Sequence, residues 1–248
     1  MEKGLFLSYQ PQTGNVNMDL DERLLNFSIE NSLKFPIFRL YGWAPACVSL
    51  GRNQDDECIN KSFCQENGID IVRRLTGGRA LLHDDELTYS FVCPASFLKN
   101  GETVIQSYKE ISGALACGFK KLGIQTEFPE EKKAETKFEY CMSLSTGADL
   151  SFEGKKIVGS AQFRKNGYIL QHGSILFSLD KDKLKGIFFE EPRFDKITTI
   201  KDINPKLTGY ELSMALKNGV EEYFSMSFDT IHLQGQNVEF WLRQGICV

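Results

Sequence analysis

The chain has 248 residues, of which 42% are hydrophobic and 25% are charged. These values exclude a disordered or fibrous protein and suit a single globular domain over residues 1–248. The formal net charge of -4 argues against a dedicated nucleic-acid binder, and no apolar run approaches the roughly 20 residues that cross a bilayer, so we expect neither nucleic acid nor membrane as a partner.

Hydrophobic periodicity and turn signals in the first third of the chain predict alternating helices and strands. Apolar residues first recur at three- and four-residue steps. Short runs rich in β-branched and aromatic residues follow, separated by turns. The predicted elements are a helix over 18–33, strands over 38–43 and 47–51 around a turn at Pro45, a helix over 60–68, and a strand over 69–74.

The rest of the chain adds a long helix, hairpin strands and a final helix. Apolar residues line one face of 104–122, and Gly123 follows in the position of a helix-terminating glycine. Asn166-Gly167 is a strong hairpin signal, which predicts an antiparallel part of a sheet. The expected elements are strands over 148–153, 156–164 and 168–179, and a last helix that begins at a capping box formed by Thr208 and Glu211. Helices and hairpins in this order indicate an α+β fold.

Seven cysteines, an odd number, occur at irregular intervals. They form no CxxC pair and no zinc-type cluster with histidine, so the sequence predicts no metal site. The first residues do not resemble a signal peptide. Free thiols in this number favour the reducing cytoplasm, and they are candidates for a reactive nucleophile.

The segment 73–90, RRLTGGRALLHDDELTYS, carries the first chemical signal. Gly77 and Gly78 follow a predicted strand, where they allow close approach of a ligand and present backbone amide donors. Three arginines lie within seven residues and suit a phosphate, a carboxylate or an acyl carbonyl. A surface turn with solvated arginines is an equally good interpretation of the residues alone.

His83 and Asp84, in the same segment, are candidates for a catalytic base and its orienting acid. Adjacent residues on a strand point to opposite faces, however. The preferred interpretation is therefore structural, with His83 supporting the loop through hydrogen bonds.

The second signal is the segment 154–175, GKKIVGSAQFRKNGYILQHGSI. On a strand Lys155 and Lys156 face opposite ways, so only one of them can enter a cleft. The small residues that follow leave space for a ligand chain, and an inward lysine there can polarise a carbonyl. A solvated lysine pair beside a turn remains the alternative, and His172 by itself is more often structural than a base.

Together the two segments resemble the biotin/lipoate protein ligase and transferase superfamily, and within it the LipM-type octanoyltransferase branch. The first is similar to that branch's RRxTGGRAVLHDxELTYS pattern, and the second to its GKKxxGSAQ…ILQHGS pattern. Upstream, 43–45 and 49–54 are similar to a W-x-P…SLGxNQ strand and loop. The resemblance covers roughly residues 17–180.

The resemblance implies a mixed, largely antiparallel sheet flanked by helices, and a tunnel for a medium-length acyl chain. It also implies that Lys156 is catalytic and stands with the glycine-rich loop at the tunnel mouth. The substrate-binding residues carried over by motif are Arg74, Thr76, Gly77, Gly78, Arg79, His83, Gly159, Ser160, Ala161, His172 and Gly173.

Transferases of this branch place a cysteine nucleophile shortly before the GKK segment, and Cys141 matches that position here. Met142 stands where the branch usually has an aromatic residue. A thiol accepts an acyl group from a thioester at little thermodynamic cost, and an ammonium such as that of Lys156 would favour the attacking thiolate.

The resemblance thus implies an octanoyltransferase without a cofactor. It would take an octanoyl group from acyl carrier protein and pass it through a cysteine thioester to a lysine of a lipoyl domain or glycine-cleavage H protein, in lipoate biosynthesis. The alternatives are a lipoate–protein ligase that uses ATP and Mg²⁺, an amidotransferase between lipoyl proteins, and a binding module without activity.

Overall fold

The computed structural model describes residues 2–129, 140, 142 and 148–231 of the chain. Its strands are β1 (Glu2–Gln12), β2 (Ile37–Trp43), β3 (Cys47–Leu50), β4 (Asp70–Arg73), β5 (Leu81–His83), β6 (Glu86–Pro94), β7 (Leu150–Phe152), β8 (Lys155–Lys165), β9 (Tyr168–Leu176) and β10 (Met226–Ile231). They form a seven-stranded sheet, in the order β10-β1-β2-β6-β9-β8-β7, and a three-stranded sheet, in the order β4-β3-β5. In the larger sheet β1 is parallel to β2 and β10, and the other pairs are antiparallel.

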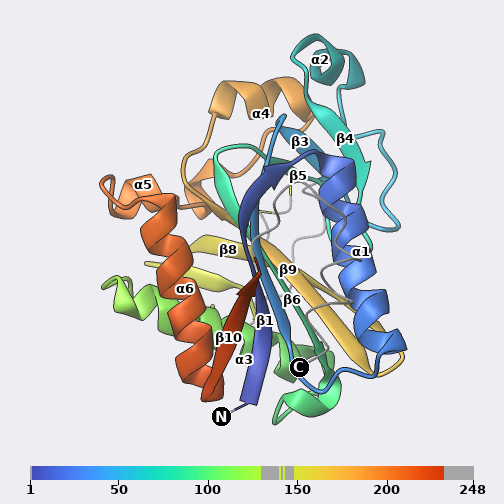
Figure 1. The fold of residues 1–248 in the computed structure, drawn as a ribbon. Coiled ribbons are helices and arrows are strands. Elements are labelled where there is room, and N and C mark those ends of the chain that lie inside the picture. The colour runs from blue at the N-terminus through green and yellow to red at the C-terminus, as the bar shows by residue number, and fades with distance from the viewer. Residues whose placement is uncertain (1, 130–139, 141, 143–147, 232–248) are drawn as a thin grey trace.

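Helices cover both faces of the larger sheet. They are α1 (Gly14–Glu30), α2 (Lys61–Glu66), α3 (Val104–Lys121), α4 (Lys181–Ile187), α5 (Ile200–Ile203) and α6 (Gly209–Phe224). Figure 1 shows α1 on one face and the pair α3 and α6 on the other, with the smaller sheet, α2 and α4 gathered at one end of the molecule. None of the helices in the described part of the chain has the length and apolar character that crossing a bilayer requires.

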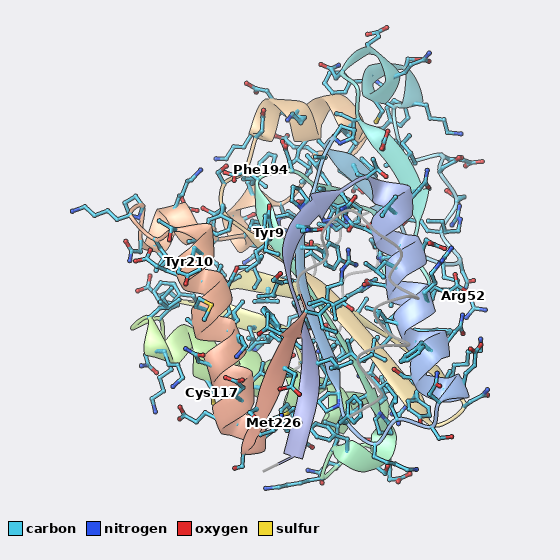
Figure 2. All side chains as sticks on the ribbon, in the orientation of Figure 1. Tyr9, Arg52, Cys117, Phe194, Tyr210 and Met226 are labelled. Atoms are coloured by element: carbon cyan, nitrogen blue, oxygen red, sulfur yellow. The ribbon has the colours of Figure 1, made fainter. Side chains whose placement is uncertain are left out.

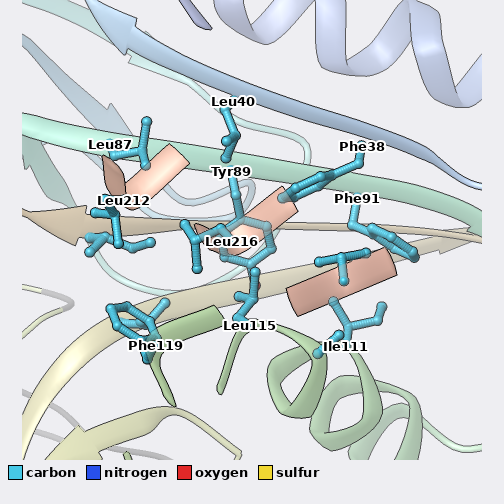
Figure 3. Close-up of a cluster of buried hydrophobic side chains, with 14 of the residues drawn as sticks. Phe38, Leu40, Leu87, Tyr89, Phe91, Ile111, Leu115, Phe119, Leu212 and Leu216 are labelled. Atoms are coloured by element: carbon cyan, nitrogen blue, oxygen red, sulfur yellow. The ribbon is translucent and has the colours of Figure 1, made fainter. Parts of the chain in front are cut away.

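The central strand β6 separates the hydrophobic core from the polar interior. Leu87, Tyr89 and Phe91 pack into the main apolar cluster with residues of α3 and α6 (Figure 3). The alternate residues Thr88 and Ser90 are equally buried but project toward the opposite face, because successive side chains on a strand alternate. That face of β6 contributes polar groups to the site described below.

The N-terminus of α1 is fixed against the smaller sheet. A Cβ at Gly14 would lie 2.5 Å from the Cys47 sulfur and 2.8 Å from a Val72 methyl group, so only glycine allows this approach. The Asn17 side chain donates to the Gly42 carbonyl at 2.9 Å. These contacts hold the first turns of α1 between the two sheets.

The predicted elements are confirmed in kind, with shifted ends. The α+β class and the mixed, largely antiparallel sheet are observed, and the capping box of Thr208 and Glu211 starts α6. The helix predicted from residue 18 begins at Gly14, because its first turn is polar and carries no apolar period. The prediction missed the strands β1, β5, β6 and β10 and the short helices α4 and α5. The strands on either side of Pro45 belong to different sheets.

Helices α3 and α6 touch backbone to backbone at two glycines. A Cβ at Gly219 would lie 2.5 Å from the Gly118 Cα and closer still to its nitrogen. Overpacking of this kind typically costs about 1–3 kcal/mol. We expect Gly219→Ala to lower the free energy of unfolding by that amount, measured by urea denaturation.

Gly209, at the other end of α6, supplies the matched control. A Cβ there would meet the nearest atom, Phe177 Cζ, at an ordinary 3.6 Å. Gly209→Ala should leave the stability unchanged or raise it by up to about 1 kcal/mol. Equal destabilisation by both substitutions would contradict the close helix contact.

Candidate active site

A cavity lies between α1, the larger sheet and the smaller sheet. Seven of the residues predicted to bind substrate line it: Arg74, His83, Gly159, Ser160, Ala161, His172 and Gly173. Its volume is about 30 Å³, which is room for about one or two water molecules. A medium-length acyl chain therefore needs wall side chains to move, and Met18 on α1 is an unbranched wall residue with three rotatable bonds.

Arg74 is the most connected polar side chain of this site. It is 6% exposed, and its guanidinium donates through all five N–H groups. Nε bonds Thr76 Oγ1, Nη1 bonds the carbonyl and hydroxyl of Ser49, and Nη2 bonds the carbonyls of Gly77 and Arg79, at 2.8–3.2 Å. A guanidinium has five donors, so a direct hydrogen bond to a substrate would require one of these to break.

His83 bridges a carboxylate and a hydroxyl. Its Nδ1 lies 2.9 Å from Glu86 Oε1, and its Nε2 lies 2.8 Å from Ser49 Oγ. The Trp43 ring stacks on the imidazole, with centroids 3.9 Å apart and planes 14° from parallel. Burial lowers the pKa of His83 below its ordinary 6.5, and Glu86 offsets this only in part.

His172 makes a second bridge of the same kind. Its Nδ1 lies 3.0 Å from Asp21 Oδ2, and its Nε2 lies 2.8 Å from Thr76 Oγ1. Asp21 also accepts from Arg39 at 2.8 Å and from the Tyr41 hydroxyl at 2.9 Å. Burial by itself would raise the pKa of Asp21, but the bonds from His172 and the charge of Arg39 lower it.

Lys156 is the buried member of the lysine pair, with 3% exposure. Its ammonium lies 3.0 Å from Asp149 Oδ2. The other oxygen of Asp149 accepts from the Tyr108 hydroxyl at 2.9 Å and from the Ser160 backbone N–H at 3.3 Å. The carboxylate therefore ties Lys156 to α3 and to Ser160, a residue of the cavity wall.

The two pairs of adjacent candidates are separated, the lysines by strand alternation on β8 and His83 from Asp84 by the bend that follows β5. Lys155 is exposed while Lys156 is buried, which excludes a fully solvated lysine pair. Asp84 turns away from His83 and pairs with Lys183 at the surface. His83 is thus not oriented by Asp84, and the structural interpretation of His83 agrees with its contacts.

Cys141 lies outside the described residues, so its distance from Lys156 stays a prediction. Met142, its described neighbour in the chain, is fully buried. The Met142 and Lys156 side chains both approach Gly159, where a Cβ would lie 2.5 Å from the Met142 sulfur and 2.9 Å from Lys156 Cε. Gly159 thus leaves room for both side chains.

The glycine-rich loop packs closely on the end of β3. The Arg52 N–H donates to the Thr76 carbonyl at 2.8 Å. A Cβ at Gly51 would collide with the Gly78 carbonyl. Gly78 has a φ of 94°, a conformation that glycine adopts without strain. Both loop glycines are exposed, so the loop can meet a ligand, as its sequence predicts.

Several polar residues of the site were not identified from the sequence. They are Asp21, Arg39, Trp43, Ser49, Glu86 and Asp149. Trp43 and Ser49 lie in the upstream motif, and Glu86 lies in the segment 73–90. Asp149 could have been identified from the sequence. It lies seven residues before Lys156, in the predicted strand that precedes the lysine strand, where an acid can reach the inward lysine.

Comparison of the sequence with known proteins shows the family of the chain. The family described as lipoyl protein ligase A/B catalytic domain matches residues 13–219, a longer stretch than the motifs indicated. Octanoyltransferase LipM of Macrococcus caseolyticus is 39% identical over 246 residues, covering 92% of this chain and 86% of that protein.

Two solved structures share the architecture. A lipoate-protein ligase A bound with ATP has a TM-score of 0.77 at 22% identity, covering 99% of this chain and 94% of that one. A bi-partite lipoate protein ligase of Thermoplasma acidophilum, described with its E2 lipoyl domain, has a TM-score of 0.72 at 21% identity, covering 99% and 92%. The fold predicted from the resemblance is therefore confirmed.

The chain belongs to the lipoyl protein ligase A/B catalytic domain family. Its similarity to octanoyltransferase LipM confirms the predicted branch and the predicted class of enzyme, an acyltransferase. It is an enzyme of lipoyl-protein modification.

The depressed pKa of His83 predicts a pH-dependent stability. Above pH 6.5 the imidazole is neutral in the folded and unfolded states, so it does not make the free energy of unfolding depend on pH. Below it the unfolded chain binds a proton that the folded chain excludes, so stability falls as the pH drops. The slope contributed is at most about 1.4 kcal/mol per pH unit.

Urea unfolding between pH 7.5 and 5.5 measures this slope. Glu86, Arg74 and His172 are the charged or titratable groups nearest the imidazole. In His83→Gln the free energy of unfolding should change less steeply with pH than in the wild type. Identical slopes would show that His83 does not exclude the proton.

The Lys156–Asp149 pair predicts a large stability effect. Asp149→Asn removes the charge that the buried ammonium faces, which typically costs about 3–5 kcal/mol. The charge-neutral double variant Asp149→Asn with Lys156→Gln should recover part of the loss. Asp229→Asn, which breaks an exposed pair with Lys3, should change the stability by less than about 1 kcal/mol; a similar effect at positions 149 and 229 would refute a buried ion pair.

Proposed function

We propose that this octanoyltransferase moves its acyl group in two steps through a thioester on Cys141. In the first, the Cys141 thiolate attacks the carbonyl carbon of octanoyl-acyl carrier protein, and the carrier's thiolate leaves and takes up a proton. In the second, a lysine amine of a lipoyl domain or glycine-cleavage H protein attacks the acyl-enzyme. An amide forms, the C–S bond breaks, and the amine proton returns to the Cys141 sulfur.

The observation that carries the proposal is the position of Lys156. Its ammonium is buried and held by Asp149 beside Gly159 and Ser160 of the cavity wall. A fixed positive charge in a site of low dielectric stabilises the oxyanion of a tetrahedral intermediate. It also favours the thiolate form of a nearby cysteine.

The chain neighbours of Cys141 support its assignment. Tyr140 forms a bridge with Ala80, the residue after the glycine-rich loop. Met142 packs at Gly159, beside Lys156. The two described neighbours thus contact the loop end on one side and the lysine strand on the other.

Four of the five described cysteines are poor nucleophiles. Burial raises the thiol pKa of Cys47, Cys64, Cys93 and Cys117 above the ordinary 9.0, so little thiolate is present at neutral pH. Cys117 lies on α3, on the side of the molecule away from α1 and Arg52 (Figure 2). It therefore serves as a control thiol.

The partners follow from charge and from the family. Arg52 and Arg73 are exposed next to the glycine-rich loop, where they can dock acidic proteins such as carrier proteins and lipoyl domains despite the negative net charge. The T. acidophilum ligase acts on a lipoyl domain, which supports the same class of acceptor here. The transfer as written requires no cofactor.

Intact-mass measurement tests the proposed chemistry. Incubation with octanoyl-acyl carrier protein, without ATP, should add one octanoyl group to the wild type and to Cys117→Ser. Cys141→Ser should gain none. Lys156→Met should acylate about 10²- to 10³-fold more slowly, the typical loss when one oxyanion donor is removed.

The same assay separates the alternatives. Acyl transfer that requires ATP, Mg²⁺ and free lipoate or octanoate would identify a ligase. An adduct formed only from a lipoyl protein donor would identify an amidotransferase. Unchanged mass with every donor, together with binding of the lipoyl domain, would identify a binding module and overturn the proposal.

A further inference from the structure

Two hydrogen-bonded chains of the same design end at Arg74. One runs from Glu86 through His83 to Ser49, and Ser49 Oγ accepts from Arg74 Nη1 at 3.1 Å. All its members are buried.

The second chain runs from Asp21 through His172 to Thr76, and Thr76 Oγ1 accepts from Arg74 Nε at 3.2 Å. Its acid lies on α1 and its histidine on β9, whereas Thr76 lies in the glycine-rich loop. Carboxylate, imidazole and hydroxyl follow in the same order as in the first chain.

The positions of the protons follow from the partners. A carboxylate only accepts, so Nδ1 of each imidazole carries the hydrogen. Arg74 only donates, so Ser49 and Thr76 accept from it. Each of these buried hydroxyls has one remaining partner among the described residues, the Nε2 atom of its histidine. The hydroxyl hydrogen therefore has an acceptor only if the hydroxyl donates to Nε2. Both histidines are thus neutral Nδ1–H tautomers.

We infer that Asp21 and Glu86 are positioning residues of the transfer reaction. Through His172 and His83 they turn the lone pairs of Thr76 and Ser49 toward Arg74. Arg74 then holds the carbonyls of Gly77 and Arg79, which fixes the backbone of the glycine-rich loop. By setting the histidine tautomers, the two acids therefore fix the backbone conformation of the glycine-rich loop at the cavity.

The held carbonyls determine which way the loop amides point. In a trans peptide the C=O and N–H groups lie on opposite sides. The Gly77 carbonyl faces the guanidinium, so the N–H of Gly78 faces away from it, on the exposed side of the loop. A loop released from Arg74 would lose this orientation, and a misplacement of about 1 Å costs up to roughly 10²-fold in rate.

Asp21→Asn should reverse the tautomer of His172. The charged Arg39 faces Oδ1 of Asp21 and selects the amide oxygen at that position. The amide nitrogen then faces His172 Nδ1, which must become an acceptor and move its proton to Nε2. ¹⁵N-detected imidazole spectra of the resting enzyme show this as an exchange of the two nitrogen signals, with His232→Gln assigning the third histidine of the chain.

Glu86→Gln serves as the control variant, because it should leave the tautomer of its histidine unchanged. Oε1 of Glu86 accepts the hydrogen bonds from His83, Thr88 and Ser174, while Oε2 has no partner among the described residues. The amide nitrogen therefore takes the place of Oε2, and the Nδ1–H tautomer of His83 should persist.

The kinetic readout rests on the proposed function, whereas the spectra do not. We expect Asp21→Asn to slow single-turnover acylation of Cys141 between about 10- and 100-fold. Thr76→Val, which cuts the same chain and leaves the Asp21–Arg39 pair intact, should slow it to the same extent if Asp21→Asn proves unstable. Asp229→Asn is the surface control and should acylate as the wild type does.

The inference would be overturned if His172 kept its Nδ1 proton in Asp21→Asn. It would also be overturned if a variant with the reversed tautomer, or Thr76→Val, were acylated at the wild-type rate. Absence of acylation in the wild type would instead refute the proposed function. The tautomer result would stand apart from that failure.

Discussion

The guanidinium of Arg74 connects the smaller sheet, the glycine-rich loop and, through Thr76, the larger sheet. It bonds Ser49 on the smaller sheet and the backbone of the glycine-rich loop, and through Thr76 it reaches His172 on the larger sheet. Burying an unpaired guanidinium would be very costly, so the surroundings must supply acceptors for all its donors. The requirement that five donors be satisfied at once therefore fixes the loop, the strand end and the hydroxyls relative to one another.

Charge balance makes such a polar interior tolerable. Arg39, Arg74 and Lys156 are buried around the cavity, and so are Asp21, Glu86 and Asp149. Asp21 meets Arg39 and Asp149 meets Lys156 directly, which offsets the cost of removing these charges from water. Because the cations and carboxylates are equal in number, a neutral thioester can enter without disturbing the balance. In the proposed transfer, the negative charge that develops would meet a lysine already held in place.

Local sequence patterns were sufficient for much of the fold and for part of the site. Alternation along a strand separated Lys156 from Lys155, the pair Asn166-Gly167 marked the hairpin, and Thr208 with Glu211 marked the start of α6. Two of the acids, Asp21 and Glu86, could not be assigned a role in this way. Asp21 and His172 are 151 positions apart, and Glu86 lies in the first motif without a local sign of its partners. Such partners are brought together by sheet order and helix packing, which no local period encodes. Strand β6 was missed because its buried polar face interrupts the apolar pattern.

The contact of Gly14 with Cys47 and Val72 has a consequence for the shape of the cavity. It sets how closely the first turns of α1, and with them the wall residue Met18, can approach the smaller sheet. A larger side chain at position 14 would push the start of α1 away from β3 and β4. The narrowness of the cavity therefore depends on a residue that does not line it.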